Sequence, residues 1–277
     1  MEWRKPLDNI ISNEQWNHYE QDGYLKLGRV LSDDDLTALQ NRIDDIMLGK
    51  ASVAYDRMLM QLDSITGDYG SAGVQSRGFK GATLNYRKIQ ELEFDPLFLA
   101  YMQRPLFREI CSRVYGEGTP IAAFRAMFMN KPAQRGTMLP WHQDRWTHLN
   151  RDPLITVWTA LDPATVANGC VQIIPGSHKL GLINPSHPSA FITEEQARQL
   201  APAGKVAHLE LQAGEAVLLH NWLLHSSDVN RTEVSRRAFS VCYMDGRTHA
   251  SNDERYSLIF GPGALELETT GMALALQ

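Results

Sequence analysis

Short runs rich in β-forming residues recur between residues 120 and 245, and this spacing limits the fold more than any other feature of the chain. Turn-forming segments such as DPATVANG, PGSH and QAGE separate the runs. Regularly spaced short strands are typical of antiparallel sandwiches and barrels. We therefore predict a mainly β fold with a jelly-roll (cupin-like) core, built from IAAFRAMFMNK, LITVWTALD, GCVQIIPGS, KVAHLELQ, EAVLLHNWLLHSS and RRAFSVCYM.

The first 119 residues have a different character. Ser12 and Ser32 precede two stretches with apolar residues at helical spacing, 13–23 and 33–50, and a third helical stretch covers 95–116 with a break near Pro105. A short strand, YLKLGRV, is expected between the first two. Residues 51–85 show no period, which is typical of a lid or pocket wall. We predict a single domain over 1–277, with a mainly helical and irregular flank at 1–119, a jelly-roll core at 120–260 and a helical insert near 193–202.

Composition narrows the classes of partner. The chain has 277 residues and a formal net charge of −5, which gives no electrostatic footprint for nucleic acid or an anionic membrane. No stretch approaches the roughly 18 apolar residues of a membrane span, and the first ten residues lack the apolar core of a signal peptide. Cys111, Cys170 and Cys242 are isolated and lie in apolar runs, as reduced buried thiols do. A cytoplasmic location is the default expectation, and no feature predicts the oligomeric state.

One triplet suggests a metal site. His142 and Asp144 are two residues apart, so on a strand their side chains point to the same face. With the distant His225 they would form the two-histidine, one-carboxylate triad of non-haem Fe(II) oxygenases, which leaves positions open for co-substrate and O₂. A structural zinc site would instead close its coordination, usually with cysteines. The triplet alone is weak evidence for a metal site, because such triplets arise by chance. A histidine at the end of an apolar strand is also often a core residue.

A basic residue follows the distal histidine at a suggestive spacing. Arg236 comes eleven residues after His225, at the start of the next predicted strand. If the two strands pair as a hairpin, Arg236 faces the cavity that contains His225. A buried guanidinium requires an anion, and its fork matches a carboxylate. The alternative is that Arg236 or Arg237 is a solvated surface charge.

Together these segments resemble the phytanoyl-CoA dioxygenase family. MFMNKPA followed by PWHQD is similar to the family's strand and its HxD loop, and EQDGYLKLGRVLSDDDL resembles its opening. The stretch 154–181 resembles the segment that ends in the family's PGSHK turn, and 218–243 resembles the region of the distal histidine and arginine. The resemblance covers most of the chain and is lowest in 51–85 and 185–204. The joint occurrence of these segments is specific to the family, whereas each segment by itself is not.

The resemblance implies a double-stranded β-helix, an Fe(II) site at His142, Asp144 and His225, and 2-oxoglutarate held by Arg236. By the same matching, further contacts to the co-substrate are expected from Lys88, Met127 and Trp158. Without the family pattern, the lysine would be read as a solvated charge, and the methionine and the tryptophan as core residues.

The implied reaction is that of a 2-oxoglutarate-dependent dioxygenase, which uses O₂ to hydroxylate an unactivated C–H bond and releases succinate and CO₂. Related halogenases have a small residue where this chain has Asp144, so hydroxylation is favoured, while desaturation and ring formation stay open. Two rival interpretations are a cupin-like metal protein that does not use 2-oxoglutarate and a catalytically inactive family member that acts as a sensor.

The substrate is expected to be a small organic molecule. The basic residues that could bind the phosphates of a coenzyme A thioester are scattered, and the family name is therefore no guide to the substrate. Candidate pocket residues are Arg77, Phe79, Tyr86, Arg145, Trp146 and His148. His220 and Trp222 are expected in the pocket wall or behind the metal ligands.

Overall fold

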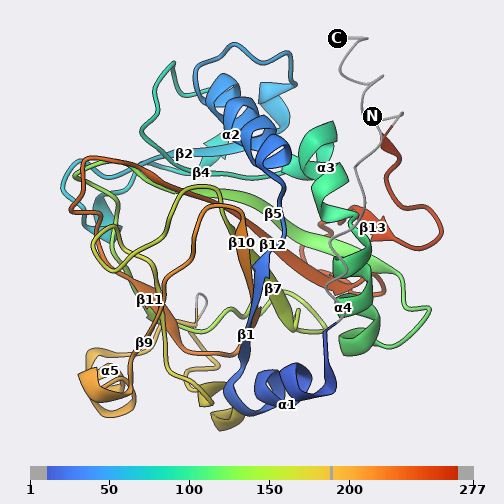
Figure 1. Ribbon diagram of the computed structural model, residues 1–277, viewed down its shortest axis with the longest axis vertical. Helices are drawn as coiled ribbons and strands as arrows, with labels where there is room; N and C mark the ends of the chain where they lie inside the picture. Colours follow the sequence, from blue (N-terminus) through green and yellow to red (C-terminus); the bar gives the residue numbers. More distant parts are fainter. Residues whose placement is uncertain (1–10, 188–189, 268–277) are drawn as a thin grey trace.

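The structure is a computed structural model that describes residues 11–187 and 190–267 (Figure 1). Within them, a major sheet contains β1 (Tyr24–Arg29), β2 (Leu59–Leu62), β3 (Ser76–Arg77), β4 (Tyr86–Ile89), β5 (Ile121–Lys131), β7 (Ile155–Ala160), β10 (Glu215–His220), β12 (Arg236–Asp245) and β13 (Leu258–Phe260). A minor sheet contains β6 (Leu139–His142), β8 (Val171–Ile173), β9 (Ala207–Leu209) and β11 (His225–Ser227). The α-helices are α1 (Asn13–Asp22), α2 (Asp33–Met47), α3 (Pro96–Met102), α4 (Pro105–Tyr115) and α5 (Glu194–Leu200). Short 3₁₀ turns are η1 (Tyr55–Arg57), η2 (Tyr69–Ser71), η3 (Leu92–Phe94), η4 (Ser177–Leu180) and η5 (Ala203–Lys205).

Local signals define the helix ends, as the sequence predicted. The Ser12 hydroxyl accepts a hydrogen bond from the Gln15 backbone N–H in a capping box, and Gly23 ends α1 in the left-handed conformation. Ser32 caps α2, which ends at residue 47 rather than at the predicted residue 50. Pro105 opens α4, so the stretch predicted at 95–116 is two helices that meet near this proline. The predicted insert near 193–202 is α5.

The major sheet has the strand order β1-β10-β7-β12-β5-β4-β2-β3, with β13 paired to β5. Its longest pairing is the antiparallel contact of β5 with β12, in which Lys131 is opposite Arg236 and Arg125 is opposite Cys242. The bounds of β5 are those predicted. Side chains alternate between the two faces of a strand, and Phe239 on one face packs against Phe98 of α3 with ring centroids 4.7 Å apart. The opposite face is therefore left to line a pocket.

The N-terminal part supplies strands as well as helices. β1 pairs with β10 at one end of the major sheet, and β4, β2 and β3 extend the other end. The prediction that 51–85 is irregular is wrong for Leu59–Leu62 and Ser76–Arg77, because strands this short show no alternating pattern and depend on pairing with distant partners. We propose that 1–119 and 120–260 form one folding unit, since the described residues of both share this sheet and one hydrophobic cluster.

The minor sheet has the order β6-β11-β8-β9. The run EAVLLHNWLLHSS contains two strands, β10 and β11, because the chain crosses from the major to the minor sheet between His220 and His225. Residues of both sheets line one pocket, so their inner faces oppose each other. The mainly β, jelly-roll prediction is confirmed. No helix in 11–187 and 190–267 has both the length and the apolar character needed to cross a membrane.

Candidate metal centre and co-substrate pocket

A pocket of about 260 Å³ lies between the two sheets. All seven side chains predicted to bind iron or 2-oxoglutarate line it: His142, Asp144, His225, Arg236, Lys88, Met127 and Trp158. The two histidines come from the minor sheet, and the predicted co-substrate contacts come from four strands of the major sheet. Packing of one sheet on the other therefore assembles the pocket.

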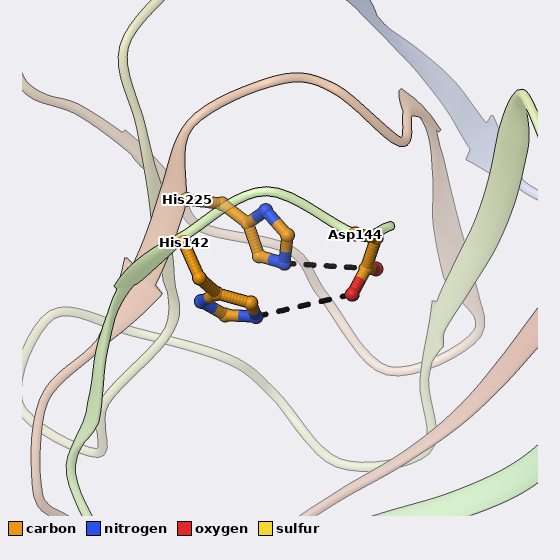
Figure 2. A group of neighbouring side chains, drawn as sticks. All are labelled: His142, Asp144 and His225. Atoms are coloured by element: carbon orange, nitrogen blue, oxygen red, sulfur yellow. Dashed lines mark ion pairs between the residues drawn. The ribbon is translucent and has the colours of Figure 1, made fainter. Parts of the chain in front are cut away.

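The two histidines and the aspartate converge on one point. His142 ends β6 and His225 begins β11, and the two residues are opposite each other in the antiparallel pairing. The Asp144 carboxylate lies 3.9 Å from His142 Nε2 and 3.8 Å from His225 Nε2 (Figure 2). One donor atom from each residue lies within 4.8 Å of the others. This geometry allows all three side chains to bind a single ion.

Asp144 reaches this point from a loop. β6 ends at His142, so the premise that both side chains share one strand face is wrong. The Asp144 backbone N–H donates to the Asn221 carbonyl at 2.7 Å. The buried Gln143 side chain donates to the carbonyls of Gly181 at 2.8 Å and Trp222 at 2.7 Å. These bonds hold the loop, and Trp222 contributes through its backbone rather than as part of the pocket wall.

Hydrogen bonds also fix the tautomer of both imidazoles. His142 Nδ1 lies 2.8 Å from the Pro140 carbonyl, and His225 Nδ1 lies 2.9 Å from the Leu223 carbonyl. A carbonyl oxygen only accepts, so each Nδ1 carries the proton and each Nε2 presents its lone pair. Both Nε2 atoms are the ones that face Asp144 (Figure 2). This arrangement is typical of metal-binding histidines.

The electrostatics of the triad suit a divalent ion. Burial, together with the nearby His225 and against the opposing charge of Asp144, lowers the pKa of His142 to about 3. His142 is therefore neutral at pH 7, as a ligand must be. Two nitrogen donors and one carboxylate, with no thiolate, match the donor set of non-haem Fe(II) and leave coordination positions open. The residues present fit the predicted iron.

Arg236 offers an anion site in the same pocket. Its side chain is 2% exposed, and its Nε and Nη1 have no hydrogen-bond partner among the described residues. The guanidinium lies 5.2 Å from the centre of the Trp158 ring. Burial lowers its pKa to about 10, which leaves it charged at pH 7. A buried, partnerless fork fits a carboxylate such as the distal group of 2-oxoglutarate.

The hairpin premise behind Arg236 is wrong. β11 and β12 belong to different sheets, and Arg236 shares a pocket with His225 because the sheets face each other. Arg237 is not a solvated charge either. It points away from the pocket and forms ion pairs with Asp162 at 2.8 Å and Asp44 at 2.7 Å. Adjacent arginines on one strand therefore differ in whether the protein already neutralises them.

Three more predicted residues form rows on the same wall. Lys88 of β4 is opposite Met129 of β5, and Met127 of β5 is opposite Ser240 of β12, which in turn is opposite Trp158 of β7. Burial lowers the pKa of Lys88 to about 7, with smaller effects from nearby cations and an opposing effect from the metal-site carboxylate. Lys88 is therefore a buried amine in a largely apolar row, and Lys131, which is opposite Arg236, is a second buried amine at that end.

Of the other pocket candidates, Arg145 and Trp146 line the pocket. Four do not: Arg77, Phe79, Tyr86 and His148. Arg77 forms an ion pair with Glu91 at 2.9 Å, and the Tyr86 side chain is fully buried. His148 lies 3.7 Å from Glu254. These four side chains lie outside the pocket, and those of Arg77 and Phe79 are exposed.

His220 lies behind the wall. Its neighbour Leu219 lines the pocket, so alternation along β10 directs His220 to the other face. There it packs against His178, with ring centroids 4.9 Å apart, and Tyr19, with ring centroids 6.5 Å apart. Of the two alternatives for His220, the pocket wall is wrong. A place behind the metal ligands agrees with its contact to the metal-binding loop, because the Trp222 backbone N–H donates to His220 Nδ1 at 3.0 Å and the Trp222 carbonyl accepts from Gln143.

Several pocket residues were not predicted. The main ones are Tyr69, Gln75, Arg125, Met129, Thr156, Phe191, Ser240 and Cys242. Arg125 and Met129 lie two residues on either side of the predicted Met127, so period-two counting along β5 identifies them. The first two belong to the segment 51–85, which supports the pocket-wall expectation for part of it. No local pattern points to them.

Comparisons with known proteins agree with this geometry. The sequence profile described as Phytanoyl-CoA dioxygenase (PhyH) matches residues 19–238. A probable phytanoyl-CoA dioxygenase of Caenorhabditis elegans is 29% identical over 248 residues, covering 85% of this chain and 76% of the relative. The peroxisomal phytanoyl-CoA dioxygenase of Rattus norvegicus is 26% identical over 267 residues, covering 92% and 72%.

Solved structures share the fold. EctD from S. alaskensis with 2-oxoglutarate and 5-hydroxyectoine aligns with a TM-score of 0.65 at 18% identity, covering 96% of this chain and 89% of that one. EctD with bound Fe aligns with a TM-score of 0.64 at 21% identity, covering 96% and 84%. The profile match spans most of the chain and includes the triad and Arg236. The chain therefore belongs to the phytanoyl-CoA dioxygenase family of non-haem iron, 2-oxoglutarate-dependent oxygenases.

Proposed function

We propose that the protein hydroxylates an unactivated C–H bond of a small organic molecule, using Fe(II), 2-oxoglutarate and O₂ and releasing succinate and CO₂. One observation carries the proposal: a triad of two imidazoles and a carboxylate shares its pocket with the partnerless guanidinium of Arg236. In this proposal, iron is held by His142, Asp144 and His225. The co-substrate is held by Arg236, Lys88, Met127 and Trp158.

The protein contributes position and exclusion of water. When bound, Fe(II) with 2-oxoglutarate and O₂ supplies the oxidising chemistry. The Nδ1 hydrogen bonds of His142 and His225 keep both Nε2 lone pairs directed at one point. Trp158 and Met127, both nearly buried, keep water from the Arg236 end. Asp144 fills the ligand position that a small residue would open to a halide, which favours hydroxylation.

The size of the pocket supports a small substrate. Its volume is about 260 Å³, whereas ligand pockets commonly hold about 300–1,000 Å³. 2-Oxoglutarate must share this space with the reacting part of the substrate. This volume favours a small substrate over a long acyl thioester of coenzyme A.

The charges around the pocket also argue against a coenzyme A thioester. The phosphates of that cofactor need a basic groove, but the basic residues of the flanking segment are engaged locally. Arg77 pairs with Glu91 at 2.9 Å, and Lys80 Nζ donates to the Arg77 carbonyl at 2.8 Å. The Arg57 guanidinium lies over the Phe94 ring at 3.9 Å. The family name therefore describes ancestry rather than the proposed substrate.

We also propose a reducing, cytoplasmic setting and no nucleic-acid partner. The three cysteines, Cys111, Cys170 and Cys242, are buried free thiols. The net charge of −5 gives no support to nucleic-acid binding. Some relatives are described as peroxisomal, including the one from Rattus norvegicus. Localisation of a tagged full-length protein would separate these compartments.

The deciding experiment is anaerobic addition of Fe(II) and 2-oxoglutarate to the protein, followed by visible spectroscopy. We expect the weak charge-transfer band of the chelate in the wild type. His225→Ala should abolish the band by removing a ligand. Arg236→Ala should weaken 2-oxoglutarate binding by about 10- to 100-fold, since hydrogen bonds to charged groups contribute roughly 1.5–3 kcal/mol, and should leave iron binding unchanged.

Arg237→Ala is the matched control, because it removes a guanidinium from the adjacent residue on the other face of β12. We expect it to lower stability while the affinity for 2-oxoglutarate stays within about threefold of the wild type. Absence of the band in the wild type would favour a cupin-like protein that does not use 2-oxoglutarate. Conversion of 2-oxoglutarate to succinate without a substrate would exclude the inactive-sensor interpretation.

A further inference from the structure

A second guanidinium faces the pocket from the same wall. Arg125 lies on β5, on the face that also carries Met127 and Met129, and it is opposite Cys242 of β12. Arg236 is opposite Lys131, six residues further along β5. At about 3.4 Å per residue, roughly 20 Å of strand separate the two arginine positions. The pocket therefore has one guanidinium toward each end.

No protein group occupies the Arg125 fork. Among residues 11–187 and 190–267, no hydrogen bond or ion pair of its side chain is present, and its guanidinium carbon lies 4.8 Å from the Trp146 ring centre and 5.1 Å from the Phe124 ring centre. Such contacts hold the cation in place without using its N–H donors. Arg145, which also lines the pocket, differs because it pairs with Asp152 at 3.6 Å. Arg125 thus keeps its donors for a ligand.

The metal site lies opposite the wall between the two arginines. Asp144, Cys242 and Lys88 all line the pocket. Cys242 is opposite Arg125, and Lys88 is opposite Met129, four residues further along β5. A co-substrate anchored at Arg236 therefore approaches the metal from one end. A second molecule anchored at Arg125 would approach it from the other end.

The charges of the loaded pocket leave one cation uncompensated. Iron(II) and 2-oxoglutarate carry equal and opposite charges, and Asp144 offsets Arg236. Burial lowers the pKa of Lys88 to about 7, so this amine loses its proton around neutral pH, whereas a guanidinium stays charged. The remaining positive charge at Arg125 matches a single negative charge on the substrate.

We propose that Arg125 binds a carboxylate of the primary substrate, so that the enzyme acts on small monoanionic carboxylic acids. This inference rests on the proposed function, since it takes Arg236 as the site of the co-substrate. The planar fork of Arg125 would bind the carboxylate through two hydrogen bonds. The rest of the substrate would then extend toward the triad. Arg125 fixes which end of the substrate is held and which C–H bond lies near the metal.

The test uses the full-length protein with Fe(II) and 2-oxoglutarate under nitrogen. The probes are small carboxylates paired with their primary amides, such as phenylacetate with phenylacetamide and hexanoate with hexanamide. Binding is read from the shift of the charge-transfer band and from the thermal unfolding temperature. We expect the wild type to bind at least one carboxylate tenfold or more tightly than its amide.

Arg125→Gln should reduce this preference to below threefold, while its affinity for 2-oxoglutarate stays within threefold of the wild type. Arg125→Lys keeps the charge but not the fork, and should show an intermediate preference even if Arg125→Gln does not fold. Arg198→Gln, an exposed arginine on α5 paired with Glu195, is the control and should keep the full preference.

Three outcomes would overturn the inference while the proposed function stands. They are no carboxylate preference in the wild type across the panel, an unchanged preference in Arg125→Gln, and loss of 2-oxoglutarate binding in Arg125→Gln. The last result would assign Arg125 to the co-substrate. Failure of the wild type to form the charge-transfer band would instead refute the proposed function.

Discussion

The two walls of the pocket are built differently. The major-sheet wall consists of long, continuous pairings such as β5 with β12. Arg125 projects from within β5, and Arg236 is the first residue of β12, where it is paired with Lys131. The minor-sheet wall consists of strands of three or four residues. Its ligands His142 and His225 lie at strand ends, and Asp144 lies beyond one. The first wall supplies the charged groups, which only have to point into the pocket. The second wall supplies the metal-binding atoms, which have to meet at one point.

This difference separates the residues that bind iron from the residues that stabilise the fold. A long strand fixes the direction of a side chain through alternation alone, and the same strand carries the aromatic core on its other face. Three donors within 4.8 Å of one another require loops that deviate from regular pairing. Those loops are held by a few hydrogen bonds of Gln143 and Asn221. We expect changes in the minor wall to remove iron binding without unfolding the protein.

The largest effect is expected for Asp144→Ala. Loss of hydrogen-bonding partners around metal ligands typically lowers affinity about 10- to 100-fold, and loss of a ligand itself should exceed that range. Iron affinity, measured by titration of the metal-free protein under nitrogen, should fall by more than about a hundredfold, and succinate formation should be lost. The unfolding temperature of the metal-free protein should change little.

Asp34→Ala, on the exposed first turn of α2, removes the same charge and is the control. It should bind iron as the wild type does. If Asp144→Ala unfolds the metal-free protein, the separation of the iron site from the stabilising core is wrong.

An intermediate effect is expected for Gln143→Ala. The side chain donates two hydrogen bonds to backbone carbonyls and accepts a third from the Ile183 N–H at 2.8 Å. Without them the loop should hold Asp144 less rigidly, and iron affinity should fall by about 10- to 100-fold. Metal titration and the charge-transfer band would both report the loss.

Gln199→Ala on α5 removes a glutamine whose side chain donates to Glu195 within the same helix. It should leave iron affinity unchanged. An iron affinity of Gln143→Ala equal to that of the wild type would show that the triad does not depend on this loop.

The smallest effect concerns the outer side of the major sheet. Burial lowers the pKa of His220 from its usual value near 6.5 to about 4, with a further contribution from His178. Between these two pH values the His220 imidazole is therefore protonated in the unfolded chain but not in the folded protein. The free energy of unfolding should fall as pH decreases from about 6.5 to about 4, by roughly 1–3 kcal/mol from this residue.

Urea unfolding of the metal-free protein at pH 7.5 and pH 4.5 measures this loss. His220→Gln removes the titrating group, so the difference in stability between the two pH values should shrink relative to the wild type. If the variant and the wild type lose equal stability, His220 does not resist protonation in the folded protein.

Sequence patterns identified the parts of the fold that local physics determines. The run of β-forming residues in β5, set off by turn signals, defines both of its ends, and Ser12 and Ser32 mark helix starts through their hydroxyls. The segment containing Leu59–Leu62 could not be predicted in this way, because its strands are defined by pairing with distant residues. Local sequence patterns predict secondary structure only where interactions between neighbouring residues determine the conformation.

The candidate site shows the same division. His142, Asp144, His225 and Arg236 were found through a motif, although two of the reasons given for their proximity were wrong. The sequence suggested a shared strand and a hairpin, whereas a loop and the packing of two sheets bring these residues together. Arg125 was missed because its significance depends on having no partner, and a sequence shows residues but not the absence of contacts around them.

The backbone orients both metal-facing imidazoles, and this determines how such enzymes can diversify. Each metal-facing imidazole is held by the carbonyl of the residue two positions before it in its own chain, Pro140 for His142 and Leu223 for His225. The orientation of these rings is thus independent of the side chains on the opposite sheet. Substitutions there can reshape the pocket for a new substrate while the catalytic centre stays intact. The backbone thus preserves the metal-binding geometry, while the residues that determine substrate selectivity can change.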